Sequence, residues 1–402
     1  MQVLFLLTQS LGYPSGLGRY WPLARQMVRL GFKVEIAALH PAWLSLRQRE
    51  FIQDGVRVTY VGQMHVYEDA GGNRRQYFGS LELVRVTAAA TAALARIALS
   101  RQADVIHIAK AQPMNGLAGW LSSWLGSRKL YLDCDDDEAA SNRFGSEWQR
   151  SIVRWWESNL PGAARGITVN TSFLRDRCLR MGVPPHRVRL IPNGFDPDRF
   201  RPLAAPEIES VRRRWGLDNR RVVLYLGSIS LTNHPIGLLL EAFEQVRRSV
   251  PSAVLLVVGG GDDYDKFARM IRDRELSSSV VLAGRVDPAA VAPIFAASEL
   301  SVDPVYDDYA ARARSPLKIV ESLAMGVPVV TGDVGDRAAM IANGRVGILV
   351  QPGSAQALAD GIMAALQDPA RRESMANTAR AASQCYRWDR LVRDFVQIYN
   401  VA

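Results

Sequence analysis

Short apolar runs alternate with amphipathic stretches along the chain, and glycine follows several of the runs. The pattern comes in two series, one ending near residue 170 and the other beginning after Pro202. Apolar runs of strand length, each followed by a helical period, predict parallel β-strands with helices on both faces of the sheet. In chain order the predicted strands are Val3–Leu7, Val34–Ala38, Val105–Ile108, Lys129–Leu132, Gly166–Asn170, Val222–Leu226, Ala253–Val258, Val280–Ala283, Leu300–Asp303, Val327–Thr331 and Val346–Val350.

Two such series predict an α/β protein with two doubly wound domains, joined near Asp196–Pro206. Ligands of such sheets bind beyond the carboxyl ends of the strands, so two facing sheets place a site in the cleft between them. The last segment, Trp388–Tyr399, carries an apolar stripe at helical spacing. The faces of the second sheet already have helices of their own. We therefore expect this last helix to pack on the first domain.

The segment Arg314–Val330 predicts a helix followed by a buried strand. Ser315 is expected to act as the N-cap and Pro316 to occupy the first helical position. Lys318 and Glu321 are three residues apart, so they share one face near the helix N-terminus. A helix N-terminus beside a lysine favours a phosphate or diphosphate. A surface ion pair between the two side chains is the alternative, and the segment alone does not decide between them.

The composition of the chain limits the classes of partner that we expect. The chain has 402 residues, of which 48% are apolar, enough for two hydrophobic cores. Its formal net charge is +9 and its pI is about 9.7, which favours anionic partners such as nucleotides or acidic lipid head groups. The sequence has neither a Lys/Arg run nor an aromatic RNA-binding motif, so we expect no nucleic acid partner.

The cysteines and the apolar segments indicate the compartment. Cys134, Cys178 and Cys385 are far apart in sequence and form no CxxC motif. This pattern predicts a reducing compartment without disulfides or a zinc site. The N-terminal run lacks the basic region of a signal peptide, and the helix predicted over Val86–Leu99 is too short to span a bilayer. We expect a cytoplasmic protein, with peripheral contact at the inner face of the membrane left open.

Glycine turns and strand ends recur in a defined order over essentially the whole chain. In order they are Gly16-Leu-Gly-Arg-Tyr20, Asp104-Val-Ile-His107, Ile191-Pro-Asn-Gly-Phe-Asp196, Leu224–Gly227, Val257–Gly261, Val281–Gly284, Ser315–Val330 and Gly347–Gly353. Together these segments resemble the retaining glycosyltransferases of family 4, which have the two-domain GT-B fold. The resemblance implies an acceptor-binding domain over residues 1–198 plus 387–402, completed by a returning C-terminal helix. Residues 199–386 would form the nucleotide-sugar donor domain.

The resemblance also implies roles for single residues. Lys318 would neutralise the diphosphate, and Glu321 would hold the nucleotide ribose. His107, at the end of its strand, would orient the sugar or the acceptor. Gly16 and Gly18 would let the backbone approach the diphosphate or sugar from the first domain. The other implied donor-binding residues are Gly227, Gly259, Arg285, Arg314, Ser315, Pro316 and Leu317. Base recognition is expected in the loops after Gly259 and Gly284, the second of which holds Arg285.

Two positions depart from the family pattern. Many members carry a second glutamate with seven residues between it and the one at Glu321, and here that position is Ala313. The family's Arg and Lys after the strand-ending glycine are replaced by Ser228 and by the segment Thr232–Pro235. Phosphate neutralisation then falls on a set of candidate cations, namely Lys318, Arg314, Arg312 and His234.

The acidic segment Asp133–Glu138 follows the strand Lys129–Leu132. Clustered carboxylates suit a Mg²⁺ site, contacts to an acceptor hydroxyl, or the cap of the next helix. The resembling fold binds its donor without a metal motif of this kind. We therefore favour acceptor contact, with Asp135 as the candidate, or capping, and we expect no metal site. Lys110 is interpreted as a solvated loop residue.

A helical stripe adds a further question. Trp148, Ile152, Trp155 and Trp156 recur at helical spacing with arginines nearby. Such a stripe belongs either to a helix on a membrane surface or to the protein core, and we favour the core.

The sequence as a whole predicts a retaining glycosyltransferase for glycan, glycolipid or metabolite biosynthesis. It would move a sugar from a nucleotide-diphosphate sugar to a carbohydrate, lipid-linked or small-molecule acceptor, with the donor as substrate and no cofactor. One alternative is a Mg²⁺-dependent phosphohydrolase of the haloacid-dehalogenase type, suggested by the acidic motif after Leu132. Asp137 stands where that motif has Thr or Val, and the second domain would be unexplained. A catalytically inactive nucleotide-sugar-binding protein is the other alternative, because of Ala313 and Ser228.

Overall fold

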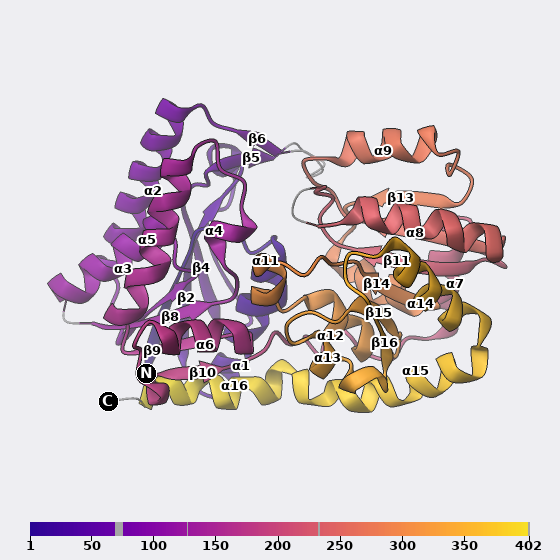
Figure 1. Ribbon diagram of the computed structural model, residues 1–402. Helices are drawn as coiled ribbons and strands as arrows, with labels where there is room; N and C mark the ends of the chain where they lie inside the picture. Colours follow the sequence, from indigo (N-terminus) through magenta and orange to yellow (C-terminus); the bar gives the residue numbers. More distant parts are fainter. Residues whose placement is uncertain (69–74, 127, 232–233, 401–402) are drawn as a thin grey trace.

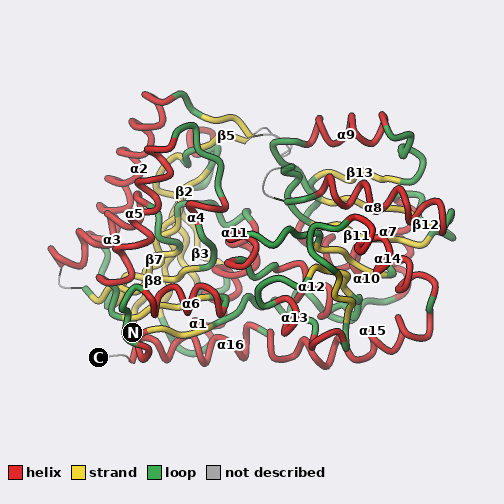
Figure 2. Tube along the Cα trace, viewed as in Figure 1, coloured by secondary structure: helices red, strands yellow, loops and turns green. Residues whose placement is uncertain are grey.

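The computed structural model describes residues 1–68, 75–126, 128–231 and 234–400. Two α/β lobes lie side by side, each built around one sheet (Figure 1). Strands run through the interior of each lobe and helices surround them (Figure 2). The predicted fold class, two doubly wound Rossmann-like halves, is confirmed.

The first sheet comes from the N-terminal half of the chain. Its strands within the described residues are β1 (Gln2–Leu7), β2 (Lys33–His40), β3 (Glu50–Gln53), β4 (Val56–Gln63), β7 (Val105–Ala109), β8 (Lys129–Cys134), β9 (Gly166–Val169) and β10 (Val188–Leu190). Across the sheet their order is β10-β9-β8-β7-β1-β2-β4-β3, and β3 alone of these is antiparallel to its neighbour. A separate hairpin pairs β5 (Val66–Glu68) with β6 (Arg75–Tyr77). The apolar pattern did not predict β3, β4, β10 or the hairpin.

The second sheet is wholly parallel. Its strands are β11 (Arg221–Leu226), β12 (Ala253–Val258), β13 (Val280–Gly284), β14 (Leu300–Asp303), β15 (Val329–Gly332) and β16 (Gly347–Val350). Their order is β13-β12-β11-β14-β15-β16. Each corresponds to a predicted strand, with ends that differ by at most two residues.

Helices cover both sheets. In the first lobe they are α1 (Trp21–Arg29), α2 (Ser80–Ser100), α3 (Pro113–Gly126), α4 (Glu138–Ser141), α5 (Glu147–Ala163) and α6 (Ser172–Arg180), with a π-helical turn over Gly16–Tyr20. The second half contains α7 (Ala205–Arg214), α8 (Ile236–Ser249), α9 (Tyr264–Asp273), α10 (Val291–Ala296), α11 (Tyr309–Ala313), α12 (Leu317–Ala324), α13 (Arg337–Met340), α14 (Ala355–Gln367) and α15 (Pro369–Ser383). The last helix is α16 (Trp388–Val396). Short 3₁₀ turns span Trp43–Ser45, Pro185–Arg187, Pro288–Ala290, Ala342–Gly344, Gln384–Tyr386 and Gln397–Asn400.

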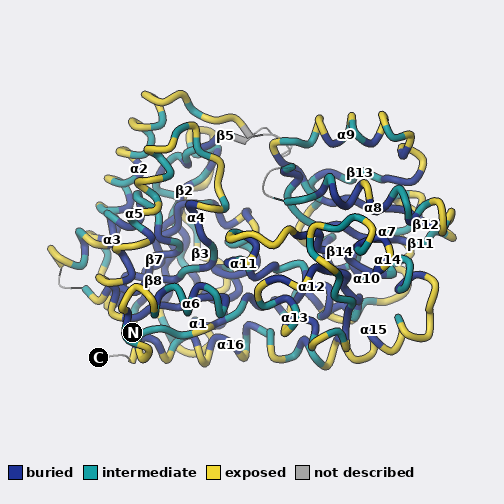
Figure 3. Tube along the Cα trace, viewed as in Figure 1, coloured by how far each residue is buried: buried dark blue, intermediate teal, exposed yellow. Residues whose placement is uncertain are grey.

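The first sheet is buried on both faces, as the continuous apolar strands require. On β1, Leu4 and Leu6 belong to the core that lies beneath α2 and α3. Val3, Phe5 and Leu7 alternate with them and belong to the core formed with α1 and α16. Figure 3 shows this buried interior enclosed by exposed helix surfaces.

The C-terminal helix α16 lies on the first lobe, although α15 before it packs on the second. Trp388 is fully buried, and its indole N–H donates a 2.7 Å hydrogen bond to the carbonyl of Gly18. Beside it, the backbone of Phe195 accepts from Trp388 N–H and donates to the carbonyl of Tyr386. The two chain segments that cross between the lobes are therefore hydrogen-bonded to each other.

Replacing Trp388 by phenylalanine should test this anchor. The change leaves the buried Gly18 carbonyl without its donor, which should lower the free energy of unfolding by about 1–3 kcal/mol. Urea denaturation of the variant would measure the loss. Trp124→Phe is the matched control, because Trp124 is 72% exposed and the same change there should be nearly neutral. Equal stability of both variants would contradict the anchoring role.

Helix α2 is longer than the sequence predicted. It has 21 residues, whereas the expectation began only at Val86. By length and composition it meets the requirement for a membrane-crossing helix, a test that core helices of globular proteins also pass. The expectation that this segment is too short to span a bilayer is therefore wrong. In the fold it lies against the first sheet and α3, with Leu94 and Ala98 fully buried, while only 22% of its apolar window is buried.

The tryptophan stripe on α5 is not core packing. Trp148, Ile152 and Trp155 are exposed, and only Trp156 turns inward, against Gly116 of α3. The sequence pattern favoured the core because a stripe at helical spacing usually marks the buried face. The inward side of α5 instead contains the charged residue Glu157. Its carboxylate accepts hydrogen bonds from the backbone N–H groups at the start of α4, which compensate for its burial.

Candidate functional site

The start of α12 lies in the second lobe, where the linker from the first lobe contacts it. Pro316 is the residue that precedes the helix, so it occupies the N-cap position expected for Ser315. Ser315 is buried, and its carbonyl accepts a 2.7 Å hydrogen bond from the amide of Asn193 in the linker. No side chain caps the helix. The first N–H groups of a helix lack intrahelical partners, so this end keeps its capacity for an anion.

Lys318 is held beside the carboxyl end of the second sheet. Its ammonium lies 3.1 Å from Oδ1 of Asp303, at the end of β14, and 4.6 Å from the centre of the Tyr225 ring. A Cβ placed on Gly227 would lie 3.3 Å from the same ammonium. Burial lowers the pKa of Lys318, and Asp303 opposes that shift. Lys318 thus pairs with Asp303, and the alternative of a surface ion pair with Glu321 is wrong.

Asp303 in turn is held between two cations. Its Oδ2 accepts a 2.8 Å hydrogen bond from Arg337, which is fully buried. Burial by itself would raise the pKa of Asp303, but Lys318 and Arg337 outweigh it and lower that pKa. Asp303 therefore stays ionised and fixes the position of the lysine ammonium.

Two further donors converge on this region. An Nη of Arg314 lies 3.5 Å from Nδ1 of His234, and the other Nη lies 3.4 Å from the hydroxyl of Ser141 in the first lobe. Arg314 also approaches Asp136 at 3.8 Å. Burial, with Arg314 and Lys318 nearby, lowers the pKa of His234 well below its usual value. The structure thus brings Lys318, Arg314 and His234 to one region.

The other candidate cation lies elsewhere. Arg312 is exposed and pairs with Asp307 at 2.7 Å on the surface. Thr232 and Asn233, in the segment that replaces the family's lysine, lie outside the described residues. Ala313, at the position of the family's second glutamate, is fully buried, and its carbonyl accepts a hydrogen bond from Thr171 of the first lobe.

Glu321 lies one turn into α12 and is only 6% exposed. Burial raises the pKa of its carboxyl group to about 7, with Arg199 opposing. No hydrogen bond or salt bridge joins this side chain to another described residue. A buried carboxylate costs free energy unless a partner satisfies it, so a ligand hydroxyl is a suitable partner here.

Glycines of the second lobe let two backbone segments approach each other closely. A Cβ on Gly259 would lie 1.9 Å from the carbonyl of Gly227, so no side chain fits where β11 and β12 end. In the first lobe, a Cβ on Gly18 would lie 2.5 Å from the side chain of Leu317. Gly16 is packed equally closely against its own loop at Leu11. Gly18 thus allows the two lobes to meet closely at the start of α12.

Arg285 follows β13 and also reaches the first lobe. Its guanidinium lies 5.8 Å from the centre of the Tyr13 ring. The loop that was expected to recognise the nucleotide base therefore lies at the junction of the two lobes.

The expectation that His107 lies at the cleft is wrong. It occupies the middle of β7 and is fully buried, stacked between Phe5 and Phe395. Its Nδ1 is 2.8 Å from the hydroxyl of Tyr399, and burial lowers the pKa of His107 to about 4. Side chains alternate along a strand, so this one points beneath the C-terminal helix rather than along the strand end.

The end of β7 instead presents Lys110. Its φ of +67° is a left-handed conformation that is uncommon for a residue other than glycine. The ammonium is largely buried and lies 2.7 Å from Glu138 and 3.3 Å from Asp135. The interpretation of Lys110 as a solvated loop residue is therefore wrong. Its left-handed turn has no sequence signature, so only the fold reveals its place.

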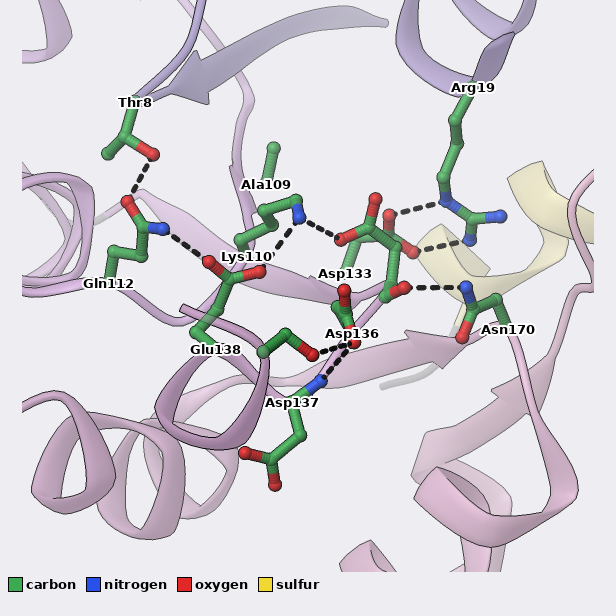
Figure 4. A network of polar contacts seen from close by, with 12 residues as sticks. Thr8, Arg19, Ala109, Lys110, Gln112, Asp133, Asp136, Asp137, Glu138 and Asn170 are labelled. Carbon is green, nitrogen blue, oxygen red and sulfur yellow. Dashed lines mark hydrogen bonds and ion pairs between the residues drawn. The ribbon is translucent and has the colours of Figure 1, made fainter. Parts of the chain in front are cut away.

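The carboxylates of the acidic segment have different sets of partners, although Asp135 and Glu138 share Lys110 (Figure 4). Glu138 receives hydrogen bonds from Lys110 and from Gln112. Asp137 caps α4 by accepting from the N–H of Ala140, so the capping interpretation holds for this residue. Burial raises the pKa of Asp135 to about 6, against the effect of Lys110. Among the described residues no group of three or more acidic, histidine or cysteine side chains is arranged to hold a metal ion.

Asp133 is the first carboxylate of the acidic segment, and it is fully buried. Both of its oxygens accept hydrogen bonds from Arg19, which is fully buried, and Tyr20 donates to it as well. The phosphohydrolase alternative needs a reachable aspartate at this position, so the burial of Asp133 contradicts it. Arg19 also donates to the side chain of Asn193, which joins this network to the linker. Sequence reasoning missed Arg19, although it follows the glycine turn directly.

Comparisons with known proteins find glycosyl transferases over both lobes. The family described as glycosyl transferases group 1 matches residues 207–382, and that of the glycosyl transferase 4-like domain matches residues 15–194. A D-inositol 3-phosphate glycosyltransferase of Rhodococcus opacus (strain B4) is 28% identical over 244 residues, which are 59% of this chain and 53% of that protein. A GDP-mannose-dependent alpha-(1-6)-phosphatidylinositol monomannoside mannosyltransferase of Mycobacterium tuberculosis is 28% identical over 228 residues, 56% of this chain and 59% of that protein. The chain thus spans little more than half the length of these relatives.

Solved structures show the same fold. Sucrose-phosphate synthase from Thermosynechococcus elongatus superposes with a TM-score of 0.77 and 19% identity, covering 100% of this chain and 98% of the other. Anabaena Alr3699/HepE in complex with UDP-glucose superposes with a TM-score of 0.75 and 19% identity, covering 100% of both chains. At this identity the likeness concerns the fold alone.

Proposed function

The chain belongs to the group 1 glycosyl transferases, and from this premise we propose that it transfers a sugar, with retention, from a nucleotide-diphosphate sugar to an acceptor hydroxyl. The observation that carries the proposal is the convergence of Lys318, Arg314 and His234 at the uncapped start of α12. Glu321 lies one turn further on, buried and without a hydrogen-bond or ion-pair partner among the residues that the structure describes.

Breaking the bond between sugar and diphosphate develops negative charge on the leaving group. Fixed cations and helix N–H groups aimed at that charge stabilise the transition state. In this proposal Lys318 and the first turn of α12 hold the diphosphate, and Arg314 and His234 assist. Glu321 accepts hydrogen bonds from the nucleotide ribose. Asp303 and Arg337 support this arrangement. Asp303, itself paired with Arg337, fixes the position of the Lys318 ammonium before the donor binds.

The acceptor side is assigned to the first lobe. Asp135 follows β8, and the carboxylate of its neighbour Asp136 lies 3.8 Å from the guanidinium of Arg314 in the second lobe. A carboxyl group with a pKa of about 6 is mostly ionised at neutral pH and can accept a hydrogen bond from an acceptor hydroxyl. Lys110 and Glu138 keep this carboxylate in place. The acceptor oxygen then bonds to the anomeric carbon on the face that the leaving group vacates, and its proton passes to the departing diphosphate as the sugar–diphosphate bond breaks, without a covalent enzyme intermediate.

The partners follow from this chemistry. The donor is a substrate, and we propose that no further cofactor is required. The acceptor is a hydroxyl of a carbohydrate, a lipid-linked sugar or a small molecule. The free thiols of Cys134, Cys178 and Cys385 support a location in the reducing cytoplasm.

A panel of UDP-, GDP-, ADP- and TDP-sugars tests the proposal. Incubation with the purified protein should release the matching nucleoside diphosphate, detected by mass spectrometry, for one donor in preference to the others. Proton NMR of the product should show the anomeric configuration of the donor preserved. Binding of a nucleotide without turnover of any donor would instead indicate an inactive nucleotide-sugar-binding protein, and an inverted product would contradict retention.

Replacing Glu321 by glutamine should weaken nucleotide binding by roughly 1 kcal/mol, because a charge-assisted hydrogen bond worth about 1.5–3 kcal/mol becomes a neutral one worth about 0.5–1.5 kcal/mol. Titration calorimetry with the preferred nucleoside diphosphate measures this. Since the pKa of Glu321 is about 7 in the empty site, the wild-type advantage over the variant should shrink as the pH falls from 8 to 6. Glu244→Gln, at a surface ion pair on α8, is the control and should bind normally. An affinity that Glu321→Gln leaves unchanged would remove the ribose assignment.

A further inference from the structure

Two neighbouring helices of the first lobe expose an unusual number of tryptophans. On the outer sides of α3 and α5, six large apolar side chains are between 42% and 72% exposed. They are Trp120, Trp124, Leu125, Trp148, Ile152 and Trp155. We call this surface the tryptophan face. Large contiguous apolar surface of this kind marks an interaction site on a folded protein.

The two rows belong to one surface because the helices touch. Trp156 of α5 fills the space above Gly116 of α3, where a Cβ would lie 2.8 Å from its ring. Trp120 and Trp124 stand one and two turns beyond Gly116 on α3. Trp155 makes an edge contact with Trp156 and points outward. In Figure 1 both helices lie on the outer side of the first lobe, away from the second.

Charge distinguishes this surface from an ordinary solvated one. Helix α3 has no charged residue from Pro113 to Gly126. On α5 the exposed charges are Arg154 and Glu147, and Glu147 already pairs with Arg150. The adjoining α2 adds exposed Arg85 and Arg96 and one exposed acid, Glu82, so arginines outnumber acids around the face. The surface is thus aromatic with a basic surround.

Helix α2 extends the same apolar surface. Its composition meets the membrane-crossing criterion, yet only 22% of the apolar window is buried. Leu81, Val84 and Leu99 are exposed along it. Since α2 packs against α3, the three helices form one layer with apolar side chains outward.

We propose that the tryptophan face docks on the surface of a lipid bilayer that contains anionic lipid. Tryptophan favours the boundary between head groups and acyl chains, and arginines nearby attract anionic head groups. A second copy of the chain fits less well, because a symmetric dimer sets the same basic surface against itself. The proposal concerns membrane contact and does not depend on the transferase reaction.

The placement relative to the cleft agrees with such docking. Arg143, shortly before α5, pairs at 2.7 Å with Asp263 of the second lobe, so this end of α5 lies at the junction of the lobes. Trp148, the second residue of α5, begins the exposed row. A bilayer on the tryptophan face would therefore lie beside the cleft, within reach of a lipid-linked acceptor.

Vesicle flotation tests the proposal directly. Wild-type protein, without donor or acceptor, is mixed with vesicles of phosphatidylcholine alone or with added phosphatidylglycerol. We expect it to float with the anionic vesicles, and we expect tryptophan fluorescence to shift to shorter wavelength on binding. The variant Trp124→Gln/Trp155→Gln should bind at least about tenfold more weakly, because two apolar anchors are lost. Leu44→Gln, at an exposed leucine outside the face, is the control and should float normally.

Circular dichroism and thermal melting of the double variant check that it is folded, which exposed positions allow. The proposal is overturned if wild-type protein does not float, if it floats equally with both vesicles, or if the folded double variant floats as well as the wild type. Light scattering during gel filtration measures the oligomeric state and so tests whether a second copy of the chain covers the tryptophan face. A dimer that the double variant abolishes would assign the face to a second copy of the chain instead.

Discussion

Replacing Lys318 by alanine is expected to lower turnover by about 10²–10³-fold, the usual effect of removing one group that stabilises developing charge. The ammonium lies at the start of α12, where the leaving diphosphate is proposed to bind, and Asp303 holds it there. In the variant Asp303 keeps its contact with Arg337, so the buried carboxylate remains paired. The loss should therefore appear in turnover far more than in the melting temperature.

Initial rates with the preferred donor, measured beside thermal melts, separate the two effects. Arg312→Ala is the matched control, since Arg312 belongs to the same segment but pairs with Asp307 on the surface. It should keep near-normal turnover. If Lys318→Ala also turns over normally while folded, the diphosphate does not lie at this helix.

Replacing Asp135 by asparagine is expected to reduce turnover by about 10²–10⁴-fold, the range for a group that takes part in proton transfer or holds a reacting hydroxyl. The carboxylate is buried and lies 3.3 Å from the ammonium of Lys110. Asparagine keeps its shape and removes its charge. The effect should fall mainly on transfer to the acceptor, with nucleotide affinity nearly unchanged.

The pH profile gives this prediction a second measurement. Because the pKa of Asp135 is raised to about 6, its ionised form is lost as the pH falls through that value. Transfer by the wild type should decline in step, and the variant should lack that limb of the profile. Asp137→Asn is the control, because asparagine also caps helices well and should preserve α4. An Asp135→Asn enzyme with normal transfer would show that the residue is only structural.

The apolar pattern by itself predicted, in their chain order, all six strands of the second sheet and five strands of the first, but not β3, β4 or β10. Fully apolar runs such as Val3–Leu7 and Ala253–Val258 can be buried only in a sheet covered on both faces, which predicts the doubly wound fold. The helix that carries Lys318 and Glu321 was also predictable from the sequence pattern of its own segment. Its start and its partners were not, since Pro316 rather than Ser315 precedes the helix and the partner of Lys318 is Asp303.

Other outcomes depended on contacts between segments far apart in the chain. His107 looked like a strand-end residue, but the C-terminal helix covers it, through Phe395 and the following Tyr399, almost 300 residues away. Lys110 gained its place from carboxylates on the next strand and helix. On α5, helical spacing gave the stripe but not its direction. Glu157 is hydrogen-bonded to the start of α4 and Trp156 packs against α3, so the neighbouring Trp155 faces outward. Local periodicity determines which element forms, whereas the neighbours that the fold supplies decide which face is buried and which residues can act.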